Sequence, residues 1–326
     1  METDVRTQSR RALAISAAML CIVTVAAPFL GGLGLDFDRL ARQEPPDWPI
    51  LVKLRVPRTL LALLTGSALS AGGALFQAIL RDPLATPSNL GVSAAASLGA
   101  VAAIALLPGE ETGLPWVILS ALCGTAVVLA LVNAMRASER FTPLTLLLTG
   151  IAINGICASM VMLLHSLAGI ARGFQITHWL MGGIDAVSYP VLVAVAALVL
   201  PVLVWILTMS RTLNVMSYGD AWAAGRGVDC RRVTWQGFAA GALLAGVTTA
   251  ITGPIGFVGL IVPHLLRPVT GPDYRVLMPA CICCGGAFLI VCDVVSRTLL
   301  APAEIPVGVV TALLGGPFFV WLLWRR

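Results

Sequence analysis

Long apolar runs separated by short polar connections fill most of this chain. Between Arg232 and Arg267 lie 34 residues without a single Asp, Glu, Lys or Arg. One straight α-helix of that length would extend about 50 Å, whereas the hydrocarbon core of a membrane is about 30 Å thick. The stretch must therefore turn, and it predicts two membrane segments.

The turn is expected at Gly253 and Pro254 with Gly256. Proline lacks a backbone donor, and glycine tolerates conformations that other residues do not. The break divides the stretch into a full span near 233–252 and a shorter one near 255–267. Interrupted membrane helices occur where irregular backbone lines a path through protein, because lipid would leave its polar groups unsatisfied. The broken helix therefore indicates a transporter.

Apolar runs of spanning length recur along the whole chain, so the expected fold class is all-α, a polytopic membrane protein with about ten transmembrane helices. With 58% hydrophobic and 11% charged residues, a soluble globular domain is excluded. The connections are too short for a separate soluble domain, so residues 1–326 are expected to form a single transmembrane domain. The expected spans are 12–31, 58–80, 91–107, 114–135, 143–168, 190–209, 233–252, 255–268, 277–296 and 305–324.

Basic residues predict the orientation, because cytoplasmic loops carry more Lys and Arg than outer loops. With a cytoplasmic N-terminus, 14 of the 21 basic residues fall inside, which favours an even number of spans and both termini in the cytoplasm. The net charge of +5 then reflects topology and implies no nucleic-acid partner. The outer set is Arg39, Arg42, Lys53, Arg55, Arg58, Arg172 and Arg297.

The chain lacks the groups that other classes of transporter or enzyme need. No phosphate-binding glycine loop is present, so an ATPase would have to be another chain. Asp293 is the one carboxylate expected inside a span, and Arg297 follows it by one helical turn. A local ion pair is favoured over a proton relay. The eight scattered cysteines are interpreted as packing residues, and no metal site is expected.

Five blocks of sequence carry the strongest pattern. They are Leu54–Leu60, Arg81–Val92, Leu213–Val228, Gly253–His264 with Arg267, and Asp293–Pro317. In this order and spacing they resemble, over nearly the whole chain, the FecCD family of permeases from bacterial ABC importers for ferric siderophores, haem and vitamin B12. The run from Glu304 to Trp324 is most similar to iron-dicitrate-type permeases.

The resemblance implies the architecture of a type II ABC importer permease, with ten helices per subunit and two subunits around a central path. It places this chain in the bacterial inner membrane, in contact with membrane lipid, and implies three protein partners: cytoplasmic ATPase subunits, a periplasmic substrate-binding protein, and a second permease, identical or homologous. The chain itself is expected to be no enzyme and to bind no cofactor, with ATP used by the partner subunit.

Arginines at the expected outer face are candidates for docking the binding protein, because a guanidinium fork binds carboxylates directionally. The resemblance assigns this role to Arg55, Arg58 and Arg297. The alternative is that they reach the membrane interface or pair internally, as Arg297 could with Asp293.

The cytoplasmic gate is expected from the resemblance at Asp82, Pro83 and Leu84, where Pro83 and Pro87 stop helix propagation. The family commonly has Asn at the position of Asp82. A carboxylate here could pair with Arg81 or repel an anionic cargo, or it could simply cap the following turn.

The resemblance implies that the cytoplasmic loop near 211–232 couples the permease to the ATPase; the alternative is an ordinary solvated loop. Its small residues would let a short helix pack closely against another protein. Trp222 is either a contact anchor or a membrane-interface residue. The coupling candidates are Ser217, Gly219, Asp220, Ala223, Ala224 and Gly227.

The fifth span has a small-residue face at Gly150, Asn154 and Gly155, which suits either helix packing or a path wall. His178–Gly183 resembles the family's segment after the fifth helix, on the outer side.

Import of a ferric siderophore is the function favoured here, with haem or vitamin B12 as alternative cargoes. A rival of another class is an ion-coupled secondary transporter, which the broken helix would also suit. An intramembrane enzyme would need paired catalytic groups, and the sequence offers none with motif spacing.

Overall fold

The computed structural model describes residues 2–31, 36–107, 114–135 and 142–324, and within these ranges the regular structure is entirely helical. In chain order the elements are α1 (Glu2–Ala26), η1 (Ala27–Phe29), α2 (Phe37–Ala41), α3 (Asp47–Pro49), η2 (Ile50–Arg55), α4 (Val56–Leu80), η3 (Pro87–Leu90), α5 (Val92–Leu106), α6 (Leu114–Met135), α7 (Pro143–Leu167), α8 (Gly169–Leu180), α9 (Tyr189–Ser217), α10 (Asp220–Ala224), α11 (Cys230–Thr252), α12 (Val258–Thr270), α13 (Tyr274–Thr298) and α14 (Val307–Trp324).

Each of the ten predicted spans coincides with one of these helices: α1, α4, α5, α6, α7, α9, α11, α12, α13 and α14. Six described helical segments are long and apolar enough to cross a membrane, namely those of α1, α4, α6, α7, α9 and α13. Helices α5, α12 and α14 are apolar but shorter. Helix α11 reaches neither group, and most of its residues from Val233 to Thr252 are buried inside the protein.

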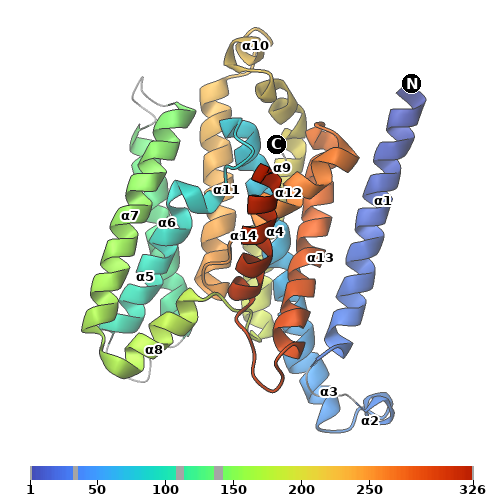
Figure 1. Ribbon diagram of the computed structural model, residues 1–326, viewed down its shortest axis with the longest axis vertical. Coiled ribbons are helices and arrows are strands. Elements are labelled where there is room, and N and C mark those ends of the chain that lie inside the picture. The colour runs from blue at the N-terminus through green and yellow to red at the C-terminus, as the bar shows by residue number, and fades with distance from the viewer. Residues whose placement is uncertain (1, 32–35, 108–113, 136–141, 325–326) are drawn as a thin grey trace.

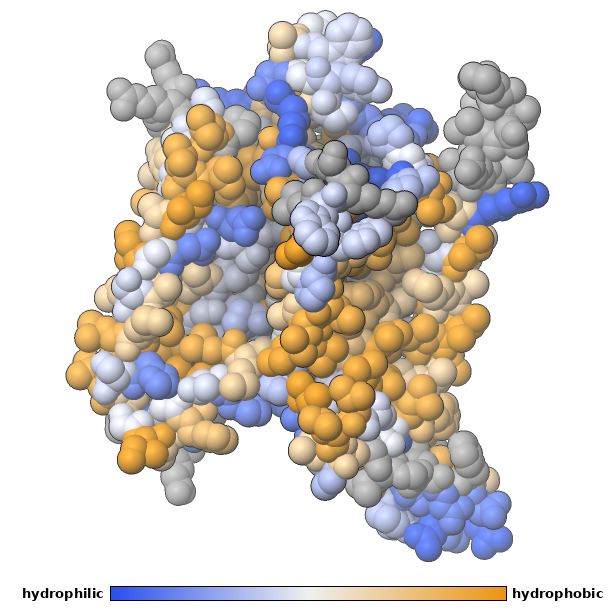
Figure 2. Space-filling model, in the orientation of Figure 1, coloured by the Kyte–Doolittle hydropathy of each residue, from blue (hydrophilic) through white to orange (hydrophobic). Residues whose placement is uncertain are grey.

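The spanning helices run between two polar ends, which we call the α10 end and the α2 end (Figure 1). Figure 2 shows hydrophobic side chains over much of the middle, with hydrophilic ones gathered near α10 and α2. Helix α1 begins and α14 finishes toward the α10 end, so both chain termini lie on the same side of the bundle (Figure 1). An even number of spans requires this arrangement. Which end faces the cytoplasm stays a prediction.

The predicted coupling loop near 211–232 is longer than the connection that the structure contains. Helix α9 continues to Ser217, and α11 begins at Cys230. The extra turns of α9 are held by Asn214, whose amide donates to Asp273 at 2.6 Å and accepts from the backbone N–H of Tyr274 at 2.8 Å. Because these partners lie at the start of α13, the local sequence of α9 gives no sign of them.

Helix α4 forms the centre of the bundle, with most of its side chains buried against α9, α11, α12 and α13. Its backbone comes very close to that of α12. A Cβ at Gly73 would lie 1.9 Å from the carbonyl oxygen of Gly259, so the two backbones touch where the helices cross. Substitution there cannot be relieved by rotating a side chain, because the obstacle is backbone.

The predicted break in the charge-free stretch is confirmed. Helix α11 ends at Thr252, and Gly253 adopts a positive φ of 67°. Helix α12 begins at Val258, after Phe257, which also has φ 67°. A bulky side chain rarely adopts this conformation, so surrounding contacts must hold it. The Phe257 ring lies against Gly315 of α14, where a Cβ would come within 2.2 Å of the ring.

Candidate functional site

The broken helix is supported by backbone from two other parts of the chain. The N–H of Gly183 donates to the carbonyl of Thr252 at 2.8 Å, and the N–H of Gly308 donates to the carbonyl of Gly182 at 2.9 Å. A Cβ at Gly253 would lie 2.3 Å from the carbonyl oxygen of Trp179. The segment that follows α8 therefore passes between the break and the start of α14, and satisfies backbone groups that the break exposes.

A cavity of about 270 Å³ lies between this break and the connector that leads from α4 to α5. One wall is formed by Thr86–Asn89 and the other by Ile255–Leu260. Both walls contain irregular backbone, which is tolerated inside a membrane protein only where protein or water surrounds it. The cavity is therefore the candidate for the part of the path that this chain contributes.

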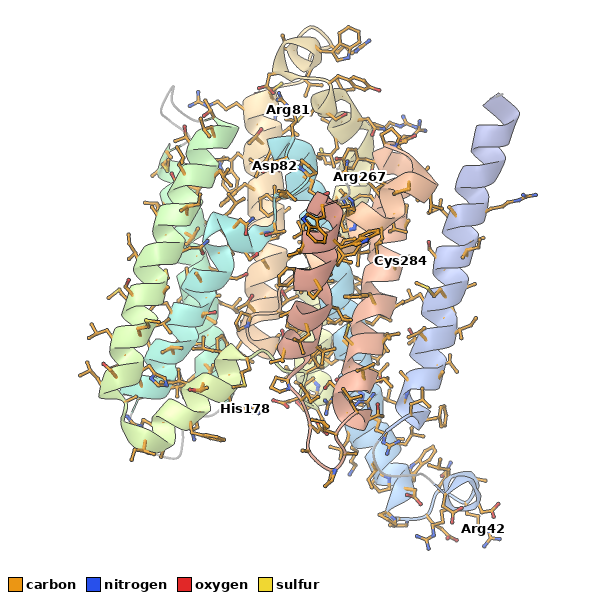
Figure 3. The ribbon with its side chains drawn as sticks, viewed as in Figure 1. Arg42, Arg81, Asp82, His178, Arg267 and Cys284 are labelled. Carbon is orange, nitrogen blue, oxygen red and sulfur yellow. The ribbon has the colours of Figure 1, made fainter. Side chains whose placement is uncertain are left out.

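The predicted gate residues begin the connector. The carboxylate of Asp82 accepts from the N–H of Leu84 at 2.9 Å, which is the turn-capping role that one interpretation predicted. Leu84 is 43% exposed, and its carbonyl accepts from the Asn89 amide at 3.2 Å. Figure 3 shows Arg81, Asp82 and Arg267 toward the α10 end. Pairing of Asp82 with Arg81, the other local interpretation, is not the arrangement found.

Arg81 instead forms an ion pair with Asp220 of α10. Arg81 ends α4 in a left-handed conformation, with φ 54°. The pair joins the predicted gate connector to the predicted coupling helix, although 139 residues separate the two side chains in sequence. Both remain partly open to solvent, with Arg81 33% and Asp220 55% exposed.

The six predicted coupling residues gather around α10, which protrudes from one end of the bundle (Figure 1). Ala223 faces inward and is fully buried against Met216 and Val233, so it anchors α10. Trp222 is 52% exposed, and the Arg226 guanidinium lies over its ring at 3.8 Å. Ser217, Gly219, Asp220, Ala224 and Gly227 are partly or fully exposed around it.

At the opposite end, three of the charged candidates meet in one cluster. The buried carboxylate of Asp293 accepts from Nε of Arg58 at 2.9 Å and pairs with Nε of Arg297 at 3.1 Å. Arg58 also donates through Nη1 to Glu304 at 2.8 Å. The predicted Asp293–Arg297 ion pair is confirmed. We call Arg58, Asp293, Arg297 and Glu304 the Asp293 cluster.

A cavity of about 490 Å³ opens beside the Asp293 cluster. Its lining includes Arg55, Arg58 and Arg297, so the three predicted docking arginines share one site. Arg55 donates to the carbonyl of Pro28 at 3.2 Å and packs on Gly31, where a Cβ would lie 2.9 Å from the guanidinium carbon. These arginines are largely buried rather than extended into solvent, with Arg58 13% exposed.

The small-residue face of α7 divides into packing and open positions. A Cβ at Gly150 would lie 2.5 Å from Cα of Leu90, so this glycine permits close contact with η3. The Asn154 amide donates to the carbonyls of Ser88 and Asn89 at 3.1 and 3.3 Å. A Cβ at Gly155 would meet no described atom within 4 Å, so this position faces open space.

A further polar group was missed by the sequence interpretation. Buried Gln77 accepts from Arg267 at 2.8 Å and donates to the carbonyl of Gly259 at 3.3 Å. Arg267 also donates to the hydroxyl of Tyr274 at 3.3 Å. This group joins α4, α12 and α13 on the α10 side of the break. An isolated buried polar residue such as Gln77 inside an apolar span is the signal that could have located it.

Among the described residues, no group of three or more His, Cys, Asp or Glu side chains is arranged to hold a metal ion. Cys281 and Cys292 are buried in α13, where small apolar side chains pack. The arrangement offers paired charges and irregular backbone around cavities.

These features define a polytopic membrane protein built for transport. The model of the FecCD transport family matches residues 13–325, and the chain belongs to this family.

Two named relatives illustrate the family. The chain is 35% identical over 326 residues to the hemin transport system permease protein HmuU of Yersinia pestis, covering 98% of this chain and 97% of the relative. It is 38% identical over 289 residues to the vitamin B12 import system permease protein BtuC of Escherichia coli O17:K52:H18, covering 86% of this chain and 87% of the relative.

Solved structures agree with the family assignment. A structure described as an inward-facing metal-chelate type ABC transporter superposes with a TM-score of 0.86 at 28% identity, covering 98% of this chain and 100% of that one. PsaBC from Streptococcus pneumoniae, in complex with Fab, superposes with a TM-score of 0.57 at 17% identity, covering 87% of this chain and 92% of that one, and shares the fold. The protein is an ABC importer permease with the type II architecture.

Proposed function

We propose that this permease carries a ferric siderophore into the cytoplasm. The main observation in support of a transport path is the cavity of about 270 Å³ between Thr86–Asn89 and Ile255–Leu260. Pockets that enclose drug-sized ligands are about 300–1,000 Å³, so this space must widen for a metal chelate to pass. Alternating movement of the two irregular walls would widen it. The structural similarity to a metal-chelate type transporter over nearly the whole chain supports a cargo of this chemical class.

Haem is the second candidate cargo, because the relative HmuU matches nearly the full length of the chain. Vitamin B12 is the third, because BtuC matches most of it. Reconstitution with the cognate ATPase and binding protein, followed by ATP-dependent uptake of ferric siderophores, haem and cobalamin, separates the three. Uptake of cobalamin or haem alone would overturn the siderophore assignment. Uptake abolished by an uncoupler yet insensitive to ATPase mutation would favour an ion-coupled carrier.

The proposed assembly contains two permease chains in the bacterial inner membrane, cytoplasmic ATPase subunits and a periplasmic substrate-binding protein. Each permease chain acts as one domain, binds no cofactor, and relies on the ATPase to use ATP. Support comes from membership of an ABC importer family. Whether the second permease is an identical or a homologous chain is tested by the mass of the purified complex.

We further propose that the α10 end faces the cytoplasm. The bias of 14 basic residues against seven supports this orientation. Cysteine substitution at Ala224, near α10, and at Arg42, at the α2 end (Figure 3), provides the test. In intact spheroplasts a membrane-impermeant maleimide should label Arg42→Cys and spare Ala224→Cys. The reverse labelling would invert the orientation.

The cavity lined by Arg55, Arg58 and Arg297 is proposed to dock acidic side chains of the binding protein. Guanidinium groups held in place by packing lose little entropy on binding a carboxylate, which suits a docking site. The double variant Arg55→Gln/Arg58→Gln should weaken capture of the binding protein by the assembled transporter. Arg39→Gln/Arg42→Gln removes the same charge from the nearby, exposed α2 region and should change capture much less. Equal effects would refute a specific site.

The connector at Asp82, Pro83 and Leu84 is proposed as the gate, and the surroundings of α10 as the contact with the ATPase. The Arg81–Asp220 ion pair supports this proposal, because it gives the two segments a direct connection. Gly150 and Asn154 are proposed to pack α7 against the connector, and Gly155 to face a neighbouring subunit or the path. The break at Gly253, Pro254 and Gly256 is proposed as the opposite wall of the path.

A further inference from the structure

The donors of Arg58 are divided between a buried carboxylate and an exposed one. Nε donates to Asp293 at 2.9 Å, and the Asp293 side chain is completely buried. Nη1 donates at 2.8 Å to Glu304, whose side chain is 55% exposed. Asp293 therefore holds the guanidinium from inside the protein, whereas Glu304 pairs with it from the more exposed side.

Glu304 lies in the connection between α13 and α14, next to the docking cavity. It is the acidic side chain in a lining that also contains Arg55, Arg58 and Arg297. The backbone next to Glu304 is fixed to α13, since the N–H of Ile305 donates to the carbonyl of Ser296 at 3.1 Å. The side chain can thus turn toward solvent without moving the connection, and an exposed ion pair costs little to break.

Guanidinium groups dominate the polar part of the cavity. Arg55, Arg58 and Arg297 line it together with the carboxylate of Glu304. Asp293 is completely buried, so Glu304 is the carboxylate of this site that an incoming acidic group can displace. The three lining arginines provide the directional donors that an acidic side chain would bind.

We propose that Glu304 is an internal competitor, a carboxylate of the permease that occupies Arg58 until an acidic side chain of the docking partner replaces it. This inference rests on the proposed docking function of the same cavity. Glu304 would lower the affinity for the partner and speed its release, while keeping Arg58 neutralised in the unoccupied transporter. Asp293 takes no part in the exchange, because it is buried and pairs with two arginines.

The test measures binding of the cognate binding protein to the full transporter in nanodiscs by surface plasmon resonance. Glu304→Gln keeps the shape of the side chain and removes its charge, so the partner's carboxylate no longer competes. We expect affinity to rise about two- to fivefold, the range set by exposed ion pairs, mainly through slower dissociation. Glu44→Gln is the matched control, because Glu44 is an exposed acid at the same end and does not line the cavity.

Equal affinity changes for Glu304→Gln and Glu44→Gln would overturn the proposal, because they would reflect net charge alone. Weaker binding by Glu304→Gln would also overturn it and make Glu304 a positioning residue for Arg58. Glu304→Ala serves as a second variant, with the same expected rise. If Arg55→Gln/Arg58→Gln leaves capture unchanged, the docking function itself fails. If that variant loses capture while Glu304→Gln fails to tighten it, only the competitor role fails.

Discussion

Charged side chains at the two ends of the bundle are held in contrasting ways. At the α2 end, Asp293 is completely buried and pairs with Arg58 and Arg297 at 2.9 and 3.1 Å. At the α10 end, Arg81 and Asp220 pair while 33% and 55% exposed. A buried network resists change, because separating its charges leaves them without water or partner. An exposed pair can part at little cost. The first arrangement suits a rigid docking platform, and the second suits a contact between segments that move.

The largest effect should follow from removing the centre of the Asp293 cluster. Asp293→Ala leaves two largely buried guanidinium groups without their shared carboxylate. We expect the free energy of unfolding to fall by about 3–5 kcal/mol, the usual cost of breaking a buried ion pair. Thermal unfolding of the purified permease in nanodiscs, monitored by tryptophan fluorescence, measures the loss.

Glu304→Gln is the control for this prediction, because it removes the exposed member of the same cluster. Its effect on stability should stay within about 1 kcal/mol. If the two variants lose similar stability, burial does not distinguish the members of the cluster, and the contrast between the two ends is wrong.

An intermediate effect is expected for Gln77, which lies inside the bundle and carries no charge. Gln77→Leu keeps the volume roughly constant but removes the acceptor for Arg267 and the donor to Gly259. Buried groups that lose a hydrogen-bond partner cost about 1–3 kcal/mol. The same unfolding measurement checks this, with Gln175→Leu on the exposed surface of α8 as the matched substitution. A loss of stability equal to that of Gln175→Leu would mean that water makes the hydrogen bonds that the Gln77 side chain no longer provides.

Local patterns in the sequence predicted the spans, the break at Gly253 and Pro254, and the ion pair between Asp293 and Arg297. Each depends on residues within one helical turn or one apolar run. The partnerships of Arg58 with Glu304 and of Arg81 with Asp220 join residues 246 and 139 positions apart, and no local pattern encodes them.

The end of α9 was placed too early for a similar reason. Hydrogen bonds of the Asn214 side chain with Asp273 and Tyr274, about 60 residues further along, stabilise the last turns of the helix. The sequence therefore indicated which segments form the site, whereas the tertiary fold determined which charges meet there.

The smallest effect on stability, and the sharpest test of the contrast, is expected at the Arg81–Asp220 pair. Arg81→Glu should cost no more than about 1 kcal/mol of stability, and the reversed pair Arg81→Glu/Asp220→Arg should recover it. A double-mutant cycle on thermal unfolding should give a coupling energy of about 0.2–1 kcal/mol. ATP-dependent uptake should fall with Arg81→Glu and return with the reversed pair, because uptake depends on the contact between connector and α10 rather than on global stability.

Salt separates the two ends directly. Raising ionic strength from 0.1 to 1 M shortens the screening length from about 10 to about 3 Å, so the coupling energy of the exposed Arg81–Asp220 pair should shrink. The stability loss in Asp293→Ala should hardly change, because the charges around Asp293 are shielded from solvent ions by the protein. A salt-independent coupling at Arg81 and Asp220 would contradict the exposed geometry. It would mean that the pair is enclosed in the assembled transporter and that the contact between connector and α10 is as fixed as the cluster at the opposite end.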